Sequence, residues 1–398
     1  MAQLLQYVEV IRLILFIMRR PQICPTLSLV LTLALTPLAN AQAPSPDKAI
    51  AFERDGNLSA AEKEWRAWLA TNPKDAAAFA SLGVVLSKEG KFDQAATAYR
   101  KALALNPKLP GIQLNLGLAE FKGKNFRAAV EPFRSALAAD PQNQQARTLL
   151  GISYYAVGDF AQASEQLAVA SAADPANVEI HNVLAQSCLS AKKYDCALNE
   201  FNWLAKQNPD SPNVHILLGE ALDGLKRTDE AIAEFQLAAK ADPHAPNVYF
   251  GLGFLYWKTG RYDEAATCFE QQLSIDPDNP EALTYLGDVE LKRNNFDKAL
   301  ALLTHAVHLR QDIRFAYLDL GSVYTELHRY DEALAALQHA EKLDPKQMDV
   351  HFRLGTLYKA MGKSADAQKE FAKIHELQKQ AEEDLADRMN GPKSTPQN

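Results

Sequence analysis

Histidine is the side chain in this sequence best suited to binding a metal, and three histidines recur at related positions. His305 and His308 are three residues apart, and His339 lies 34 residues after His305. On a helix, His305 and His308 would share one face, where a surface metal site is conceivable. No Cys-x-x-Cys or mixed Cys/His ligand spacing accompanies them, so we favour scattered surface histidines. We therefore expect no metal and no cofactor.

The cysteines allow two interpretations. Cys188 and Cys196 are eight residues apart, and Cys268 stands alone. In an oxidising compartment the first two could form a disulfide across a helical hairpin. Buried thiols that replace core residues are the alternative, and the demanding geometry of a disulfide favours them.

The motifs that carry catalysis are missing from the chain. The sequence contains no glycine-rich phosphate loop, no His-Glu-x-x-His and no Gly-x-Ser-x-Gly. The histidines at 181, 215 and 351 occur where other segments carry an aromatic residue, so we expect them at the edge of a core. We predict that the protein is not an enzyme.

The elements that position these residues are set by a 34-residue period. Prolines recur at this interval and define ten windows, the first starting at Gln42 and the last ending at Ala381. Gln311 replaces the proline of the eighth window. The recurring prolines are Pro73, Pro107, Pro141, Pro175, Pro209, Pro243, Pro277 and Pro345. An unbroken period of this length indicates one small unit that is copied many times.

Each window has the pattern of two helices. Positions 4, 7, 8 and 11 form one apolar stripe, and positions 20, 24 and 27 form a second. The short turn between them requires antiparallel helices. Position 8 is glycine in eight windows and position 20 is alanine in all ten, which lets the two backbones approach closely. We expect the mostly aromatic position 24 to fill space against the next unit, and the proline to end the second helix.

These residues resemble the tetratricopeptide repeat family, whose pattern combines Leu-Gly, an aromatic residue, Ala, Phe and Pro. The resemblance covers residues 42–381 and implies an all-α, right-handed α-solenoid of about ten helix-turn-helix units. Two windows depart from the pattern. The first has Ser45, Lys48 and Ala49 where the family has an aromatic residue, Leu and Gly, so we expect an atypical cap. The eighth ends in Arg310-Gln311, which predicts a softer junction.

The resemblance also places window positions 2, 5, 9 and 12 on the concave groove of the superhelix. Apolar side chains at these positions form two sections, separated by amides and bordered by Glu220, Asp223, Glu281 and Asp288. We predict a peptide-binding groove formed by Leu114, Leu118, Phe121, Ile152, Tyr155, Asn182, Gln186, Ile216, Phe250, Phe254 and Trp257. The alternative is that some of these side chains pack against the neighbouring repeat.

The family's clamp for chaperone C-termini is not expected here. That clamp has Lys at position 5 and Asn at position 9, and no window here has Lys at position 5.

The two ends of the chain fall outside the repeats. Arg19-Arg20, an apolar run from Leu27 to Leu38 and Ala39-Asn40-Ala41 predict a cleaved signal peptide over residues 1–41. Met18 is a possible true start. An uncleaved membrane anchor is the alternative, but the run is short for a spanning helix. Residues 382–398 are expected to form a polar helical cap and a disordered tail.

Charge narrows the class of partner. The chain has 42 basic and 49 acidic residues, and three of the basic residues and one of the acidic residues lie in residues 1–41. Removal of residues 1–41 would leave 39 basic and 48 acidic residues, a net charge of −9. Such a surface disfavours nucleic acid and anionic membranes. We predict an exported, periplasmic or secreted scaffold or adaptor that binds an unidentified protein or peptide. The alternative is an envelope assembly factor that acts through its convex face or by self-association.

Overall fold

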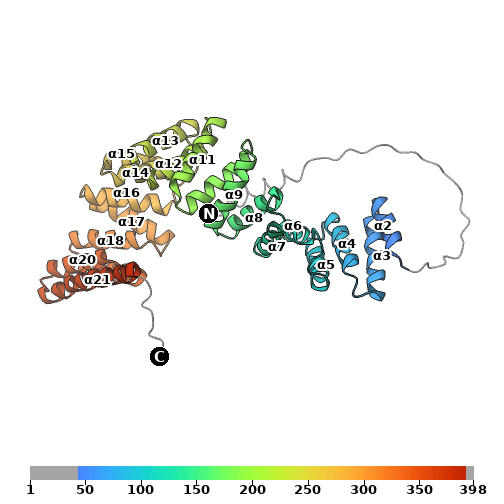
Figure 1. The fold of residues 1–398 in the computed structure, drawn as a ribbon. Coiled ribbons are helices and arrows are strands. Elements are labelled where there is room, and N and C mark those ends of the chain that lie inside the picture. Colours follow the sequence, from blue (N-terminus) through green and yellow to red (C-terminus); the bar gives the residue numbers. More distant parts are fainter. Residues whose placement is uncertain (1–43, 391–398) are drawn as a thin grey trace, which may run out of the picture. The chain divides into compact units, whose positions relative to one another are not determined.

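A computed structural model describes residues 44–390, which are all-α: they form 20 helices and, within that range, no strand (Figure 1). The chain divides into two compact units, residues 1–204 and 205–398, and the boundary lies within α11 (Tyr194–Gln207). The predicted signal peptide and the tail after Asn390 lie outside the described residues. None of the described helices is both long and apolar enough to cross a membrane.

Helices of the first unit alternate between first and second helices of successive repeats. They are α2 (Pro46–Arg54), α3 (Leu58–Thr71), α4 (Ala76–Lys88), α5 (Phe92–Leu105), α6 (Ile112–Lys122), α7 (Phe126–Ala139), α8 (Gln144–Ala156), α9 (Phe160–Ala173), α10 (Val178–Ser190) and the part of α11 up to Leu204. The atypical first repeat has a first helix of nine residues, against 13 in α4.

The second unit continues the same alternation. Its helices are α12 (Pro212–Gly224), α13 (Thr228–Ala241), α14 (Val248–Lys258), α15 (Tyr262–Ile275), α16 (Pro280–Lys292), α17 (Phe296–Leu309), α18 (Arg314–Glu326), α19 (Tyr330–Leu343), α20 (Met348–Ala360) and α21 (Ser364–Asn390). α21 includes residues 382–389, which the sequence indicated as an extension of the last helix.

Six of the ten described first helices begin at a short polar side chain that caps them. Asp75 Oδ1 accepts a hydrogen bond from the Ala78 amide at 2.9 Å, and Asn279 Oδ1 accepts one from Ala282 at 2.9 Å. In the eighth window, α17 still ends at Leu309 without the proline, but Ile313 offers α18 no side-chain cap. The predicted softness of this junction remains a prediction.

The turn inside each hairpin needs one left-handed residue. Window position 15 has positive φ in all ten repeats, as at Gly260 (φ 77°) and Lys226 (φ 62°). Such a residue ends a helix by letting the following amide reach back to a carbonyl of the last turn. The Arg261 amide donates to the Tyr256 carbonyl at 2.9 Å in this way. The chain can therefore reverse within a few residues.

The predicted close approach of the two helices is confirmed. Ala231 at position 20 is fully buried, and a Cβ added to Gly219 would lie 2.7 Å from the Phe235 ring. Phe235 also fills space against the following repeat, because a Cβ on Gly251 would meet the same ring at 2.2 Å. The residue at position 24 thus packs inside its own hairpin as well as against the next one.

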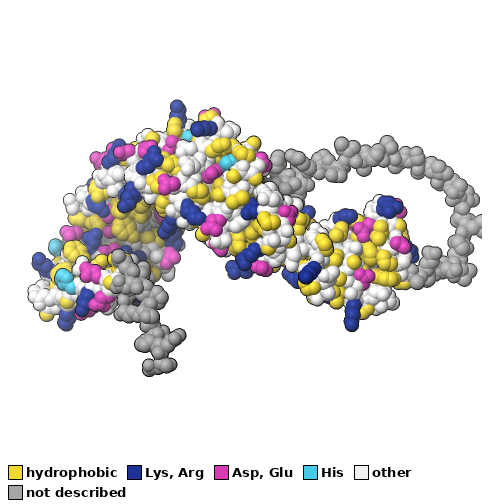
Figure 2. Space-filling model, viewed as in Figure 1, with side chains coloured by type: hydrophobic (Ala, Val, Ile, Leu, Met, Phe, Trp, Pro, Cys, Tyr) yellow, Lys and Arg dark blue, Asp and Glu magenta, His cyan; other side chains and the backbone are white. Residues whose placement is uncertain are grey.

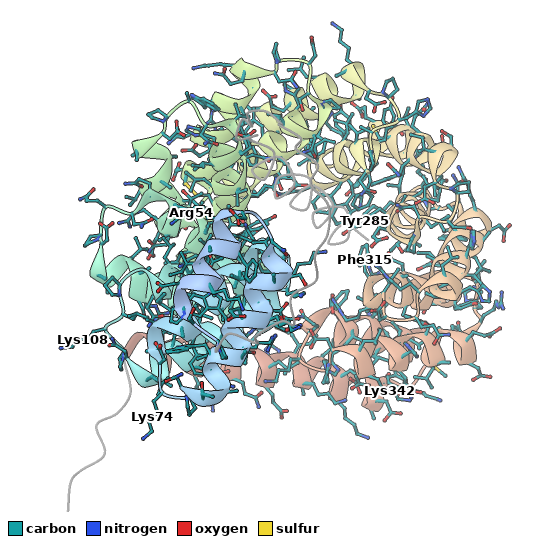
Figure 3. All side chains as sticks on the ribbon, turned by 90° about the vertical axis from the view of Figure 1, so that its right-hand side faces the viewer. Arg54, Lys74, Lys108, Tyr285, Phe315 and Lys342 are labelled. Carbon is teal, nitrogen blue, oxygen red and sulfur yellow. A yellow bond between two sulfur atoms is a disulfide. The ribbon has the colours of Figure 1, made fainter. Side chains whose placement is uncertain are left out.

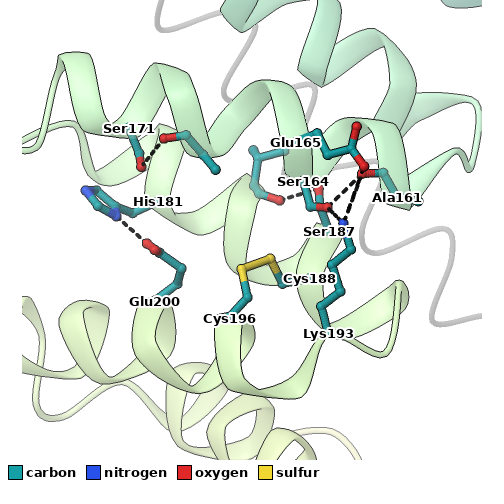
Figure 4. Close-up of a disulfide and its surroundings, with 12 residues drawn as sticks. Ala161, Ser164, Glu165, Ser171, His181, Ser187, Cys188, Lys193, Cys196 and Glu200 are labelled. Atoms are coloured by element: carbon teal, nitrogen blue, oxygen red, sulfur yellow. Dashed lines mark hydrogen bonds and ion pairs between the residues drawn. A yellow bond between two sulfur atoms is a disulfide. The ribbon is translucent and has the colours of Figure 1, made fainter.

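The preference for buried thiols at Cys188 and Cys196 was wrong. The two residues are joined by a disulfide between α10 and α11, with their Cα atoms 5.8 Å apart (Figure 4). The hairpin places window positions 11 and 19 opposite each other, which meets the geometric requirement. Cys268 is a buried free thiol, and burial raises its pKa to about 11.

Buried histidines replace aromatic residues at position 4, as expected, and each contacts a glutamate on the second helix. His215 Nδ1 lies 2.6 Å from Glu234 Oε2, and its Nε2 lies 2.8 Å from the Pro209 carbonyl oxygen. His181 contacts Glu200 at 2.5 Å (Figure 4). These contacts join the two helices and explain the histidines as structural residues.

Candidate protein-binding face

Five aromatic rings meet on the first helices of the second unit. Phe250, Phe254 and Trp257 come from α14, Tyr285 from α16 and Phe315 from α18; we call them the aromatic cluster. Figure 3 shows Tyr285 and Phe315 beside each other. Tyr285 joins the set, because its ring centroid lies 4.9 Å from that of Trp257, 5.4 Å from Phe254 and 5.6 Å from Phe315. Three consecutive repeats therefore contribute to one surface.

Local sequence explains how α14 presents its rings. Phe250, Phe254 and Trp257 are spaced i, i+4 and i+7, which places them on one helical face. The helix begins after Asn247, whose left-handed backbone (φ 61°) provides no side-chain cap. Gln272 of α15 takes the place of the cap, because its Oε1 accepts a hydrogen bond from the Phe250 amide at 3.2 Å. Spacing and capping together fix the orientation of α14.

Members of the aromatic cluster are half-buried, unlike the core rings behind them. Phe269, on the second helix α15, is fully buried and lies 6.0 Å from Phe250 and 5.8 Å from Tyr285, measured between centroids. The cluster thus rests on the core and keeps part of its area in contact with water. In Figure 2, hydrophobic side chains gather in a hollowed region over α16 to α18. Exposed apolar area of this kind is typical of a binding surface.

Two buried carboxylates lie next to the aromatic cluster. Trp257 Nε1 donates to Asp288 Oδ2 at 2.6 Å, and Lys292 Nζ donates to the same oxygen. The sequence analysis placed Asp288 at the border of the groove, and this was wrong. Asp288 is a buried partner of Trp257. This bond fixes the indole while leaving part of the ring exposed.

Asp319 of α18 is fully buried, and among the described residues no donor lies within hydrogen-bond distance of either carboxylate oxygen. Burial raises the pKa of Asp319 well above its usual range, and the charge of Asp288 adds to the effect. Arg353 and Lys292 oppose the shift only in part. The carboxyl of Asp319 therefore favours its neutral form.

The other acids at this face differ in exposure. Glu220 is exposed on α12, while Asp223 accepts from Lys258 Nζ at 2.7 Å and Glu281 accepts from Arg310 at 2.5 Å. Ile216, also on α12, is half-buried. Acidic and basic side chains therefore border the aromatic cluster here.

The predicted section in the first unit is mostly packed. Phe121 is buried against Phe126 and Phe133, with ring centroids 5.3 Å and 6.3 Å away, and Ile152 and Tyr155 are buried on α8. Phe121, Ile152 and Tyr155 therefore pack against their neighbours, as the alternative interpretation has it. We leave these three residues out of the proposed site. Leu114 and Leu118 of α6 are half-buried.

The amides between the two predicted sections are bonded to this packed section. The Tyr155 hydroxyl donates to Gln186 Oε1 at 2.7 Å, and Gln186 Nε2 donates to Asn182 Oδ1 at 3.0 Å. Both amide side chains are half-buried on α10. They extend a polar network within the first unit, while the predicted aromatic residues of α14 lie in the second.

Sequence reasoning missed Tyr285, Phe315 and Asp319. Tyr285 and Asp319 occupy window position 6, which the predicted stripe omitted, although this position faces the preceding repeat. Phe315 occupies position 2, which belongs to the predicted groove stripe. Its aromatic side chain at that position could therefore have identified it from the sequence. Windows 7 to 9 together, rather than window 7 alone, carry the half-buried rings of the aromatic cluster.

Two of the three histidines considered for metal binding, His305 and His339, have other contacts. His305 Nε2 lies 3.3 Å from Asp278 Oδ1, and His339 stacks on Tyr317 with centroids 4.0 Å apart. Within residues 44–390, no group of three His, Cys, Asp or Glu side chains could hold a metal ion. A surface hollow of about 450 Å³ beside α19 is lined by Gln338, Glu341, Lys342 and Pro345, and none of the predicted groove residues lines it.

Family models match most of the repeats described above. Two models described as tetratricopeptide repeat match residues 120–187, 224–272 and 256–319, and residues 47–110, 83–144 and 193–246. A third, described as TPR repeat, matches residues 321–362. The chain belongs to the tetratricopeptide repeat (TPR) family. Membership supports a protein-interaction scaffold, in agreement with the pattern in the sequence.

Solved structures of TPR proteins resemble parts of the chain. MamA AMB-1 is 31% identical over 42% of this chain and 90% of its own, with a TM-score of 0.37. YrrB, described as a TPR protein with an unusual peptide-binding site, is 25% identical over 45% and 92%, with a TM-score of 0.39. PilW, described as a type IV pilus biogenesis factor, is 20% identical over 50% and 91%, with a TM-score of 0.45. A search of curated proteins gave no match.

Proposed function

We propose that this TPR protein is a non-enzymatic scaffold that binds an extended segment of another protein on the first helices of its second unit. The observation that carries the proposal is the half-exposed aromatic cluster, to which three consecutive repeats contribute. Aromatic side chains are favoured anchors in protein interfaces, because they bury a large area at a small cost in conformational entropy. The net negative charge of the chain supports a protein partner over nucleic acid.

The mechanism follows from a surface that is already formed. The core ring of Phe269 and the Trp257–Asp288 bond hold the cluster in place before a partner arrives. An apolar side chain of the bound segment would cover Phe254 and Phe315, while the polar groups around them set its register. A rigid surface loses little entropy on binding, which favours affinity.

Site-specific photo-crosslinking tests this proposal. A photoreactive phenylalanine analogue replaces Phe254 in one variant and Leu237 in another. Leu237 is 45% exposed on the second helix α13 and serves as the matched control. We expect a discrete protein adduct at position 254 and none at position 237. The same adducts at both positions, or none at 254, would argue against the proposed face.

Export is a separate part of the proposal. The basic pair, the apolar run and the small residues before Gln42 support a cleaved signal and a periplasmic or secreted location. A disulfide between Cys188 and Cys196 suits an oxidising compartment. Mass spectrometry of the purified mature protein should find Gln42 at the N-terminus. Retention of Met18 would instead indicate a membrane anchor.

A further inference from the structure

The charge of the chain is distributed unevenly over the repeats. Residues 42–211, which form windows 1 to 5, contain 18 basic and 18 acidic residues. Windows 6 to 8, residues 212–313, contain 9 basic and 16 acidic residues, a net charge of −7, whereas windows 9 and 10, residues 314–381, contain 10 of each. An excess of one sign over a surface attracts ligands of the opposite sign. The excess negative charge thus lies in the repeats that supply α12, α14 and α16.

One of these acids, Glu220 on α12, lies next to the aromatic cluster. α12 and α14 are the first helices of successive repeats, and they are joined where Lys258 Nζ donates to Asp223 Oδ1 at 2.7 Å. Glu220 lies about one turn before Asp223, and Phe254 lies about one turn before Lys258. Because the two helices run in the same direction, Glu220 and Phe254 lie beside each other on adjacent helices.

Glu220 has no partner within residues 44–390, unlike its neighbours Asp223 and Glu281. Asp223 pairs with Lys258, and Glu281 pairs with Arg310. Among the described residues, no group donates a hydrogen bond to the Glu220 carboxylate or forms an ion pair with it. Its side chain is exposed, yet burial by the surrounding protein raises its pKa, and no neighbouring positive charge opposes the shift. Such a carboxylate gains from a cation, because an opposite charge stabilises its ionised form.

The aromatic cluster also suits a cationic side chain. The long apolar stems of lysine and arginine can lie on aromatic surface while the charged end reaches a carboxylate. Aromatic rings attract cations directly, and within the cluster Lys292 Nζ lies 5.7 Å from the centroid of the Trp257 ring. Asp319 also lacks a hydrogen-bond donor among the described residues, but it is fully buried, so a ligand on the surface does not reach it. Glu220 is therefore the acid available to a bound segment.

We propose that the segment bound at the aromatic cluster is basic, and that a lysine or arginine next to its apolar anchor pairs with Glu220. The proposal rests on the proposed binding at this face and adds the chemical class of the partner. Apolar contact with Phe254 and Phe315 supplies affinity but does not distinguish charged from neutral segments. The negative charge of windows 6 to 8 and the carboxylate of Glu220 select positively charged segments and repel acidic ones.

Fluorescence polarisation with three synthetic peptides tests this preference. The probes are short labelled peptides of equal length that share a central Leu-Phe pair and carry lysines, glutamines or glutamates on both sides. We expect the purified protein to bind the lysine peptide about tenfold or more tightly than the glutamine peptide, and the glutamate peptide least. The preference should decrease as the salt concentration rises. Equal affinity for the lysine and glutamine peptides, or no binding of the lysine peptide, would overturn the proposal.

Variants of two acids in the same repeat test the role of Glu220. Glu220→Gln should weaken binding of the lysine peptide by about threefold to fivefold and leave the glutamine peptide unchanged. Glu220→Lys should weaken the lysine peptide further and strengthen binding of the glutamate peptide. Asp229→Asn removes an exposed charge from the second helix α13 and is the control, for which we expect wild-type affinities. A lysine preference that Glu220→Gln leaves intact, or that Asp229→Asn reduces equally, would contradict the ion pair.

Phe254→Ala distinguishes failure of this proposal from failure of the proposed binding face. The substitution should weaken all three peptides, because it removes part of the apolar contact that they share. If it weakens none of them, the peptides do not bind at the aromatic cluster, and the binding face itself is wrong. If it weakens all of them while the lysine preference is absent, the face is correct and the basic partner is excluded. Circular dichroism confirms that each variant remains folded.

Discussion

At the scale of single residues, Asp319 is the side chain whose surroundings differ most from those of its counterparts. The corresponding position is Tyr285 in the preceding repeat and Arg353 in the following one. Asp319 is fully buried, no group in residues 44–390 donates a hydrogen bond to it, and the carboxylate of Asp288 adds a second negative charge nearby. Lys292 donates a hydrogen bond to Asp288. From α20, the charged groups that act on Asp319 are Arg353 and Asp349. A buried acid in this setting destabilises the fold when it ionises.

The sign of the pH effect follows from the raised pKa. The folded state binds the proton of Asp319 more tightly than the unfolded chain does, so stability falls as pH rises above the ordinary aspartate value of about 3.9. The loss is complete once the pH exceeds the raised value. We expect Asp319→Asn to increase the free energy of unfolding by about 1 kcal/mol or more at pH 8 and to have little effect at pH 4.

Thermal denaturation at the two pH values measures this difference. Glu326→Gln removes an exposed charge from the same helix and is the control, for which no comparable pH dependence is expected. An Asp319→Asn variant that is equally or less stable than wild type at pH 8 would show that the carboxylate has a partner in solution.

At the scale of secondary-structure elements, the hairpin depends on small residues at the helix crossing. Ala231 is fully buried where α13 crosses α12, and its carbonyl oxygen would lie 3.3 Å from a Cβ on Gly219. Ala231→Leu should therefore overpack the crossing and cost about 1–3 kcal/mol. Ala233→Leu makes the same change at an exposed position of the same helix. Chemical denaturation should distinguish the two variants; equal stability would contradict the helix pairing.

At the scale of the whole molecule, the period in the sequence predicted the repeats well, because the residues that build a hairpin recur in every window. Leu at position 7, Gly at 8 and Ala at 20 are determined by contacts within one unit or with its neighbour, so their spacing carries the fold. The left-handed residue at position 15 was less visible, because lysine, asparagine and histidine share it with glycine.

The candidate site was only partly predictable for a related reason. Phe254 and Trp257 stood out because their spacing places them on one face of α14. Tyr285 and Phe315 join them only when successive repeats stack, and the exposure of a side chain depends on how that stacking leaves it. Phe121 and Trp257 both occupy position 12, yet Phe121 is buried and Trp257 is half-buried. The stacking also determined the burial of Asp288, which no spacing along the chain could indicate.

The central claim is that the aromatic cluster binds the partner, and a titration of a segment recovered by cross-linking tests it most directly. Calorimetry would compare wild type with Phe254→Ala plus Trp257→Ala, and with Leu237→Ala as the control. We predict that the double variant weakens binding by about 30-fold or more, corresponding to the loss of about 2 kcal/mol at a dominant anchor, while the control binds like wild type. Wild-type affinity in the double variant, with its helical content unchanged, would contradict the account.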